Sequence, residues 1–207
     1  MNDAPWMYLV ELAAGISLAA CCGLRAFLPP LLLGLAARFH VAEMILGRPL
    51  LSPSFEWLAS RPALLVFGVA VVFELLADKI PALDHMLDVV QTFVRPLAGA
   101  LVVAASLHGS SPAVAAVAGL VAGTPVAALF HVGKAKIRLL STLGTGGLGS
   151  PVLSAAEDVA TFAGSTLALL AGVIALFVVI AGAIVTWRLV RGFLRRVGRL
   201  KQDLQQP

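Results

Sequence analysis

Long apolar runs constrain this chain more than any other feature of its sequence. The run over residues 159–187 contains 29 residues and no charged side chain. About 20 apolar residues in a helix cross the hydrocarbon core of a bilayer, so this run is long enough for one tilted span. Hydrophobic residues make up 59% of the 207 residues and charged residues 13%, about half the share typical of a soluble domain. These values exclude a water-soluble globule and a disordered chain.

The sequence predicts an all-α, polytopic helical integral membrane protein with about five spans. The expected spans cover residues 12–37, 62–77, 89–107, 112–130 and 159–187. Proline lacks an N–H and disfavours helix in the residue before it, so Pro29 and Pro30 predict a break just after Arg25. Gly119 and Gly123 form a GxxxG pair, which lets helix backbones approach closely. We expect one transmembrane domain over 1–187 and a basic, helical tail over 188–207.

Residues 131–158 differ in kind from the spans. They begin with Lys134, Lys136 and Arg138 and pass through a glycine-rich stretch, GTGGLG, at 144–149. This stretch matches GxGxxG, but a dinucleotide fold needs a strand before it and a βαβ unit around it. We therefore predict a re-entrant or loop segment that leads into a helix at Ser150 and Pro151, which suit an N-cap and a first helical position.

Five spans would place the two termini on opposite sides of the membrane. If the basic tail is cytoplasmic, the positive-inside rule also fits the loop 38–61 on that side and the acidic segment 78–88 on the other. Lys134, Lys136 and Arg138 would then lie outside, against the rule. This conflict has two explanations: the count is off by one crossing, or the segment that carries them is re-entrant.

Ionisable residues inside spans are costly, so they are candidates for function. Arg25 can hold an anionic group with two parallel hydrogen bonds, and the alternative is that it pairs with Glu74 or Asp78 to join two spans. His108 and His131 end predicted spans, so we expect them to cap helices or to face the interface. The two cysteines, Cys21 and Cys22, are adjacent in an apolar run and suit packing as small hydrophobes.

Asp84 and Asp88 form a second candidate, because residues four apart share one face of a helix. Two close carboxylates repel each other, which suits proton coupling or cation binding. The alternatives are a solvated acidic loop, or pairing with Lys134 and Arg138, which are also four apart. The second alternative would make a buried ion network.

Three stretches together resemble the opening, middle and later motifs of one family. They are GISLAACCGLRAFLPPLLLGLAARF at 15–39, ELLADKIPALDHMLDVVQTFVRPLAGAL at 74–101 and HVGKAKIRLLSTLGTGGLGSPVLSAAED at 131–158. The family is a group of bacterial multi-pass membrane proteins catalogued as domain of unknown function 4126. The resemblance implies a helical fold in the bacterial inner membrane and assigns no activity. Its motifs include the candidate residues Arg25, Asp78, Asp84, Asp88, Arg95, Lys134, Arg138, Glu157 and Asp158.

We expect a small transporter or permease-like protein for a small anionic or lipid-headgroup solute, bound by these nine residues. Broken helices with charges at the breaks are typical of such sites. The alternative is a non-transporting scaffold or lipid-binding protein whose buried charges are structural. No nucleophile or metal-ligand set is recognisable, so we expect no enzyme activity, metal or cofactor. The expected partners are membrane lipids, with anionic lipid at the cytoplasmic tail, and a second copy of the chain in a homo-oligomer, but no nucleic acid.

Overall fold

A computed structural model describes residues 5–78, 81–145 and 149–203, and every regular element in these residues is helical. The prediction of an all-α fold is therefore confirmed. The elements are α1 (Pro5–Leu24), α2 (Leu28–Arg38), α3 (Val41–Leu46), the 3₁₀ helix η1 (Pro53–Ala59), α4 (Arg61–Ala77), α5 (Pro81–Ser106), α6 (Pro112–Ala118), the π-helical turn η2 (Gly119–Gly123), α7 (Thr124–Thr145), α8 (Ser150–Leu170) and α9 (Gly172–Asp203).

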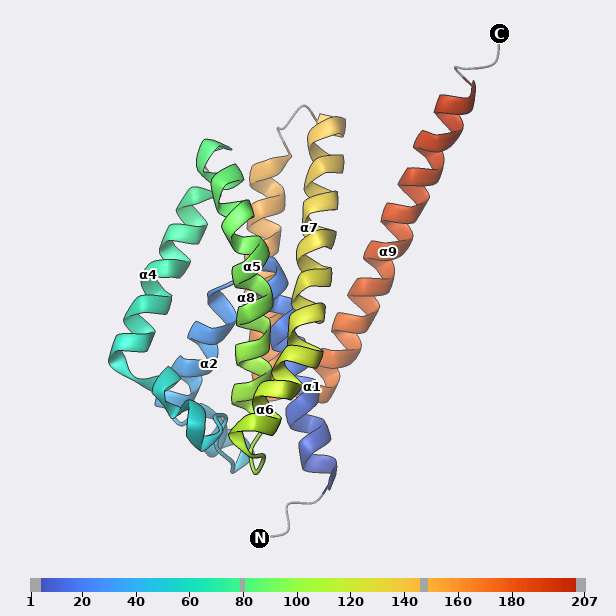
Figure 1. Cartoon of the computed structure of the whole chain (residues 1–207). Coiled ribbons are helices and arrows are strands. Elements are labelled where there is room, and N and C mark those ends of the chain that lie inside the picture. The colour runs from blue at the N-terminus through green and yellow to red at the C-terminus, as the bar shows by residue number, and fades with distance from the viewer. Residues whose placement is uncertain (1–4, 79–80, 146–148, 204–207) are drawn as a thin grey trace.

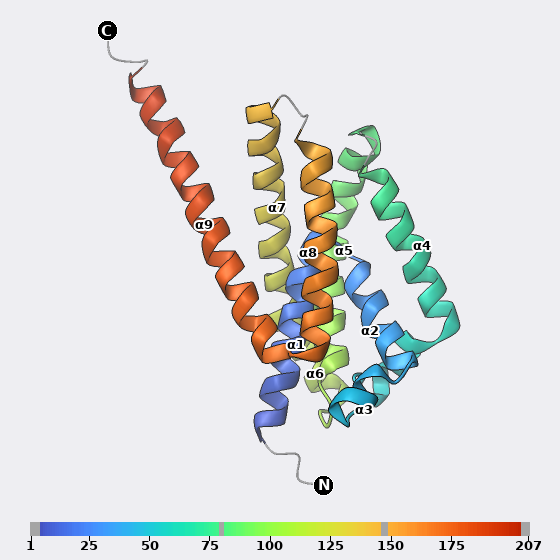
Figure 2. The ribbon, with the colours of Figure 1, turned by 180° about the vertical axis from the view of Figure 1, so that it is seen from behind.

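Helix α1 lies in the middle of the bundle, packed against α5, α7, α8 and α9. Helix α4 lies at one edge and contacts α2, η1 and α5. At the opposite edge α9 leans away from the bundle (Figures 1 and 2). The segments α3 and η1 gather at the end of the bundle where α1 begins (Figure 2).

The molecule has an apolar exterior and buries charged side chains beside its apolar core. Large apolar side chains of α4 and α9, such as Val69 and Phe177, are exposed. The buried charged side chains include Glu11, Arg25, Glu74, Arg95, Lys134 and Glu157. Exposure of this apolar exterior to water would cost a large free energy, whereas lipid tails solvate it. The exterior and the apolar helices together indicate a membrane protein.

The first apolar run is broken where the prolines predicted a break. Helix α1 ends at Leu24, and α2 begins at Leu28. The run is not one kinked span, however, because α2 turns back beside α1 (Figure 1). Leu33 of α2 and Leu18 of α1 line one small cavity, as an antiparallel pair requires. The α1–α2 pair is therefore a hairpin inside the bundle.

The predicted end of a span at residue 130 is wrong. The elements α6, η2 and α7 form a continuous helical run, in which Pro112–Gly144 is apolar and long enough to cross a membrane. Residues 131–145 and 150–158 are helical, and α8 begins at Ser150, within one residue of the predicted cap. Residues 146–148 of the glycine-rich stretch, where a re-entrant or loop segment is predicted, lie outside the described residues. His131 lies inside α7 and is buried, so it does not end a span.

The prediction of one span over 159–187 is also wrong. Helix α8 ends at Leu170 and α9 begins at Gly172, and the chain reverses between them (Figure 2). Ala171 has φ −149° and ψ 62°, which ends the α8 helix. Because of this reversal, the end of α9 lies at the same end of the bundle as the end of α7 and the start of α8, and the loop 38–61 lies at the other (Figure 1). The expected topology instead placed the tail and the loop 38–61 on one side of the membrane, and Lys134, Lys136 and Arg138 on the other.

The count of five spans is not confirmed. Among the described residues, three helices are long and apolar enough to cross a membrane: Trp6–Leu24, Val89–Ser106 and Pro112–Gly144. The bent pair η1–α4, with 60° between its two helices, makes a fourth if it counts as one span. The shorter helices α2 and Gly172–Val185 of α9 are apolar as well. The expected membrane class is thus supported, and the number of crossings stays a prediction.

Candidate functional site

The break between α1 and α2 leaves backbone groups that must be satisfied by other helices, since helix ends have unpaired N–H and C=O groups. At the carboxyl end of α1, Arg95 Nη1 donates to the Gly23 carbonyl at 3.2 Å and Lys134 Nζ donates to the Leu24 carbonyl at 3.1 Å. At the amino end of α2, the Ala26 N–H donates to Glu74 Oε1 at 3.0 Å. Cations thus meet the negative end of one helix dipole and a carboxylate meets the positive end of the other.

Gly23 makes this arrangement possible. A Cβ atom at this position would clash with the Ala127 carbonyl and with Phe130 of α7. Without that Cβ, α1 approaches α7 closely enough for Lys134 to reach the end of α1. A small residue thus sets the distance between a helix break and the cation that stabilises it.

Beside the break lies a group of alternating charges, here called the ion cluster. It consists of Arg25, Asp78, Lys134, Arg138, Glu157 and Asp158, carried by the α1–α2 break, the end of α4, α7 and α8. Lys134 Nζ lies 3.0 Å from Glu157 Oε2, and Arg138 Nη2 lies 3.3 Å from the same oxygen. Arg138 Nη2 also lies 2.9 Å from Asp78 Oδ2. Three cations and three carboxylates thus form one connected network.

Arg25 occupies the centre of the ion cluster. Its Nη1 atom lies 2.5 Å from Asp78 Oδ2, and its Nη2 atom lies 2.6 Å from Asp158 Oδ1. Nη2 also donates to the Ser154 hydroxyl at 2.9 Å, which in turn donates to Asp78 at 3.2 Å. The Nε atom of Arg25 is buried without a hydrogen-bond partner among the described residues. The Nε donor of Arg25 is therefore not used by any group in the described residues.

The carboxylates of the ion cluster differ in their access to solvent. The side chain of Asp78 is 3% exposed, whereas that of Asp158 is 36% exposed. Burial alone would raise the pKa of Asp78, but Lys134, Arg25 and Arg138 together lower this pKa below its ordinary value. Asp78 therefore keeps its charge to a lower pH than an ordinary aspartate, and Asp158 forms the open side of the cluster.

A second group, here called the Arg95 layer, lies next to the ion cluster and consists of Glu74, Gln91, Thr92, Arg95 and His131. Arg95 Nη2 lies 3.7 Å from Glu74 Oε1 and also donates to Gln91 Oε1. Arg95 Nη1 lies 2.7 Å from His131 Nδ1. A guanidinium only donates, so His131 Nδ1 accepts this bond and carries no proton.

The structure brings together most of the candidate residues. Six of the nine form the ion cluster, and Arg95 lies in the adjacent layer. Arg25 pairs with Asp78, one of the two alternatives named for it. Asp84 and Asp88 lie on α5, but their side chains are outside the described residues, so the proposed Asp–Asp face stays a prediction. Lys134 and Arg138 do share one helix face, and both reach Glu157.

Sequence reasoning did not place Gln91, Ser154 or His131 at the site, although helical spacing offered a signal for each of them. Gln91 precedes Arg95 by four residues, and Ser154 precedes Asp158 by four. His131 precedes Lys134 by three residues on the same face of α7. A search for polar residues at these spacings from each buried charge would have identified all three.

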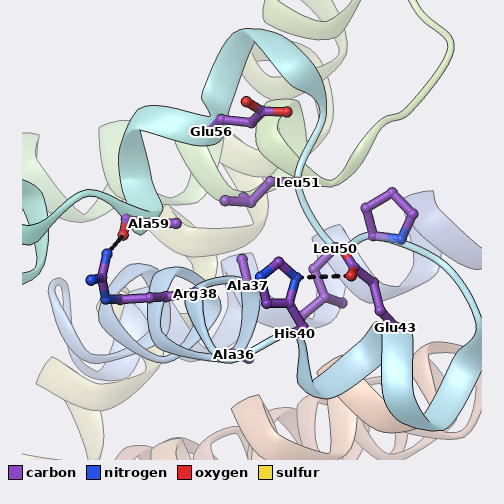
Figure 3. A pocket seen from close by; sticks show the side chains of 10 residues that line it. Ala36, Ala37, Arg38, His40, Glu43, Leu50, Leu51, Glu56 and Ala59 are labelled. Atoms are coloured by element: carbon purple, nitrogen blue, oxygen red, sulfur yellow. Dashed lines mark hydrogen bonds and ion pairs between the residues drawn. The ribbon is translucent and has the colours of Figure 1, made fainter.

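A pocket of about 380 Å³ lies away from this chemistry, between the end of α2, α3 and η1 (Figure 3). Its polar lining side chains are Arg38, His40, Glu43 and Glu56, and none of the nine candidate residues lines it. In the described part of the chain, no group of three His, Cys, Asp or Glu side chains is placed to hold a metal ion.

A comparison with protein families matches residues 12–192 to the family described as Domain of unknown function (DUF4126). The chain belongs to this family. The match covers most of the sequence, including the α1–α2 break, the ion cluster and the Arg95 layer, and it confirms the resemblance seen in the three motifs. The comparisons with curated proteins and with solved structures each found no match.

Proposed function

We propose that this DUF4126 protein is a small permease-like membrane protein and that its ion cluster binds a small anionic solute or an anionic headgroup. Arg25 would bind the anion. One observation carries the proposal: the buried guanidinium of Arg25 is paired with Asp158, a carboxylate that is 36% exposed. An anion from solution that displaces Asp158 can take its place on Arg25 without leaving a buried charge unpaired.

Two further features support this role for Arg25. The unused Nε donor gives an incoming oxyanion a second hydrogen bond, in the two-point geometry that guanidinium groups favour. The site also lies where a helix stops inside the bundle, which is how many transporters build a binding site near the middle of the membrane. Asp78 would keep the site from retaining the anion too tightly, because it stays on the opposite side of Arg25.

The ends of α9 and α7 and the start of α8 lie at one end of the bundle, which supports an orientation for the protein. The positive-inside rule favours a cytoplasmic location for this end, which carries Lys134, Lys136, Arg138 and the basic residues of the tail. In this orientation the tail also lies near anionic lipid, at about 1 kcal/mol for each charge near the surface. The bacterial inner membrane, expected from the family resemblance, is the proposed location.

A non-transporting scaffold is the second candidate, and the complete charge pairing favours it. Every cation of the ion cluster has a carboxylate within 3.3 Å. Such a network can join α1, α4, α7 and α8 without binding anything. It would then serve as an internal clamp for a membrane anchor or lipid-binding protein.

Access of water from both sides distinguishes the two candidates. We would replace Cys21 and Cys22 by Ser, introduce Ser154→Cys in the ion cluster, and label oriented vesicles with a membrane-impermeant maleimide from each side in turn. Lys136→Cys is the matched control, because Lys136 is exposed on α7 between two cluster residues. A permease predicts labelling of Ser154→Cys from both sides and of Lys136→Cys from one. Labelling of Ser154→Cys from one side only, or from neither in folded protein, would support the scaffold.

A further inference from the structure

A separate buried ionic group lies at the opposite end of the bundle from the ion cluster. It is centred on Glu11 of α1, whose carboxylate is buried. Arg48 Nη1 lies 3.2 Å from Glu11 Oε1, and the backbone N–H of His108 donates to Glu11 Oε2 at 3.0 Å. This group joins α1 to the loop after α3 and to the α5–α6 connection, and it shares no residue with the ion cluster.

The ring of His108 has one atom free to take up a proton. Its Nδ1 atom lies 3.1 Å from Glu11 Oε1 and 3.1 Å from the Ser106 carbonyl oxygen. A carboxylate and a carbonyl only accept, so Nδ1 carries the hydrogen of the neutral ring. The Nε2 atom therefore carries the lone pair. It is buried and has no hydrogen-bond partner among the described residues.

A small cavity of about 20 Å³ adjoins these side chains, and Glu11, Arg48 and His108 all line it. They are the only charged or titratable side chains in its lining. Apart from Ser106, the rest of the lining is small or apolar and comes from α1, α2, α8 and the loop after Arg48. A water molecule needs roughly 10–15 Å³, so one water fits.

We propose that Glu11, Arg48 and His108 form a proton-binding site, and that uptake of a proton at His108 Nε2 opens this end of the bundle to water. The proton comes from bulk water by way of the cavity and forms an N–H bond on the Nε2 lone pair. No other bond is made or broken. Histidine is the side chain that most often serves as a pH switch in proteins.

The sign of the effect follows from the charges that face His108. While the His108 ring is neutral, the negative charge of Glu11 and the positive charge of Arg48 cancel. Protonation adds a positive charge beside Arg48 and a buried N–H without an acceptor, and both are costly in a dry cavity. Glu11 stabilises the added charge but is already shared with Arg48. Water in the cavity relieves both costs, so the protonated site is wetter than the neutral one.

The chain contains a matched pair that can serve as a control. His40 Nδ1 lies 2.8 Å from Glu43 Oε2, the same contact between the same residue types, but these side chains are 67% and 46% exposed (Figure 3). Bulk water already solvates both of them, so protonation of His40 has no buried cavity to open. A pH response that is specific to the buried site must therefore depend on His108 and not on His40.

The test uses the full-length protein without Cys21 and Cys22 and with Ser106→Cys as the probe in the cavity wall. We would measure its rate of reaction with an impermeant maleimide from pH 8 to pH 5.5, in the parent, in His108→Gln and in His40→Gln. At each pH the parent rate is divided by the variant rate, which cancels the pH dependence of the thiol. The proposal predicts that the parent rate divided by the His108→Gln rate rises by about tenfold between pH 8 and pH 5.5. A tenfold change corresponds to a difference of one pKa unit between the closed and the open state. The ratio to His40→Gln is expected to stay constant.

A ratio to His108→Gln that does not change with pH would overturn the proposal, as would an equal change for both histidine variants. Glu11→Gln provides a second test if His108→Gln does not fold. It keeps an acceptor beside His108 and removes the negative charge, so it is expected to move the midpoint of the pH response to lower pH. An unchanged midpoint in Glu11→Gln would also overturn the proposal.

Discussion

The ion cluster and the Arg95 layer each hold a buried arginine beside the same helix break, but they satisfy it differently. Arg25 pairs with carboxylates, one of which is over one third exposed. Arg95 is fully buried, and its nearest partners are a backbone carbonyl, an amide and a neutral imidazole, with the Glu74 carboxylate farther away at 3.7 Å. The ion cluster is thus charged and open on one side, whereas the Arg95 layer is hydrogen-bonded and closed.

This difference separates a structural role from a binding role. Glu74 accepts from the N–H groups of Ala26 and Phe27 just before α2, and Arg95 donates to the last turn of α1, so the Arg95 layer fixes both ends of the break. In this layer Thr92 is exposed, but Arg95 and its partners Glu74, Gln91 and His131 are buried, so none of these four faces solvent to exchange a ligand. The ion cluster can exchange Asp158 while Asp78 keeps Arg25 in place. We therefore expect mutations in the Arg95 layer to reduce stability, and mutations at the open side of the cluster to change binding.

The largest effect is expected for Arg95→Met. The substitution keeps a long apolar side chain and removes every donor, which leaves Glu74 without its cation and the Gly23 carbonyl without a partner. Loss of one partner of a buried ion pair costs about 3–5 kcal/mol. Thermal unfolding in detergent, followed by size-exclusion chromatography, measures the loss. Arg61→Met, at the exposed start of α4, is the control and is expected to change stability by less than about 0.5 kcal/mol. Equal effects of the two substitutions would contradict a structural role for the Arg95 layer.

A second prediction concerns the packing that supports the Arg95 layer. Gly99 of α5 lies one turn after Arg95 and touches Gly123, where an added Cβ would clash with the Gly99 carbonyl oxygen. We expect Gly123→Ala to cost about 1–3 kcal/mol, because the two backbones must separate. Gly182→Ala is the control, since its added Cβ meets no atom within 4 Å. If Gly123→Ala were as stable as Gly182→Ala, close contact between α5 and η2 would not be needed to form the layer.

The sequence predicted the local features of both regions and missed their long-range geometry. The prolines predicted the break after Arg25, and Gly119 and Gly123 predicted close contact of two helices, because backbone sterics act over a few residues. A contact with Ala100 and Gly99 of α5 confirms the second prediction. The spacing of Lys134 and Arg138 likewise predicted one shared face.

Chain reversals were not predictable from the apolar pattern. The run 159–187 has no charge, proline or polar cluster that marks Ala171 as the end of a helix. The reversal depends instead on tertiary packing, where Gly172 lies against Ala14 of α1. An apolar run shows that a segment belongs in lipid, but it does not fix the number of times the segment crosses. This is why the predicted topology failed while the predicted membrane class and most cluster residues agree with the structure.

A third prediction uses the lowered pKa of Asp78. The folded pKa lies below the ordinary value of 3.8, so the charged carboxylate stabilises the fold above that pH, and this contribution is lost as the pH falls through the lowered pKa. Unfolding free energy measured between pH 6 and 2.5 should decline less steeply in Asp78→Asn than in the parent. The difference is at most about 1.4 kcal/mol per pH unit, the slope of a single proton. Glu56→Gln, with no ion pair in the described residues, should keep the parent slope. Parallel curves for Asp78→Asn and the parent would exclude Asp78 as a charged partner.

The smallest effect on stability, and the sharpest test of the comparison, is expected for Asp158→Asn. Because the Asp158 side chain is over one third exposed, its ion pair is screened by water, and we expect a loss of no more than about 1 kcal/mol. The substitution should nevertheless weaken the partner that competes with an anion for Arg25. Inorganic phosphate, titrated at constant ionic strength, is then expected to raise the unfolding temperature of Asp158→Asn more than that of the parent. The double variant Asp158→Asn with Arg25→Gln should lose this response, since the guanidinium is gone. A phosphate response that persists without Arg25 would place the anion elsewhere, and no response in any variant would favour the scaffold, with the open side of the ion cluster serving only to join helices.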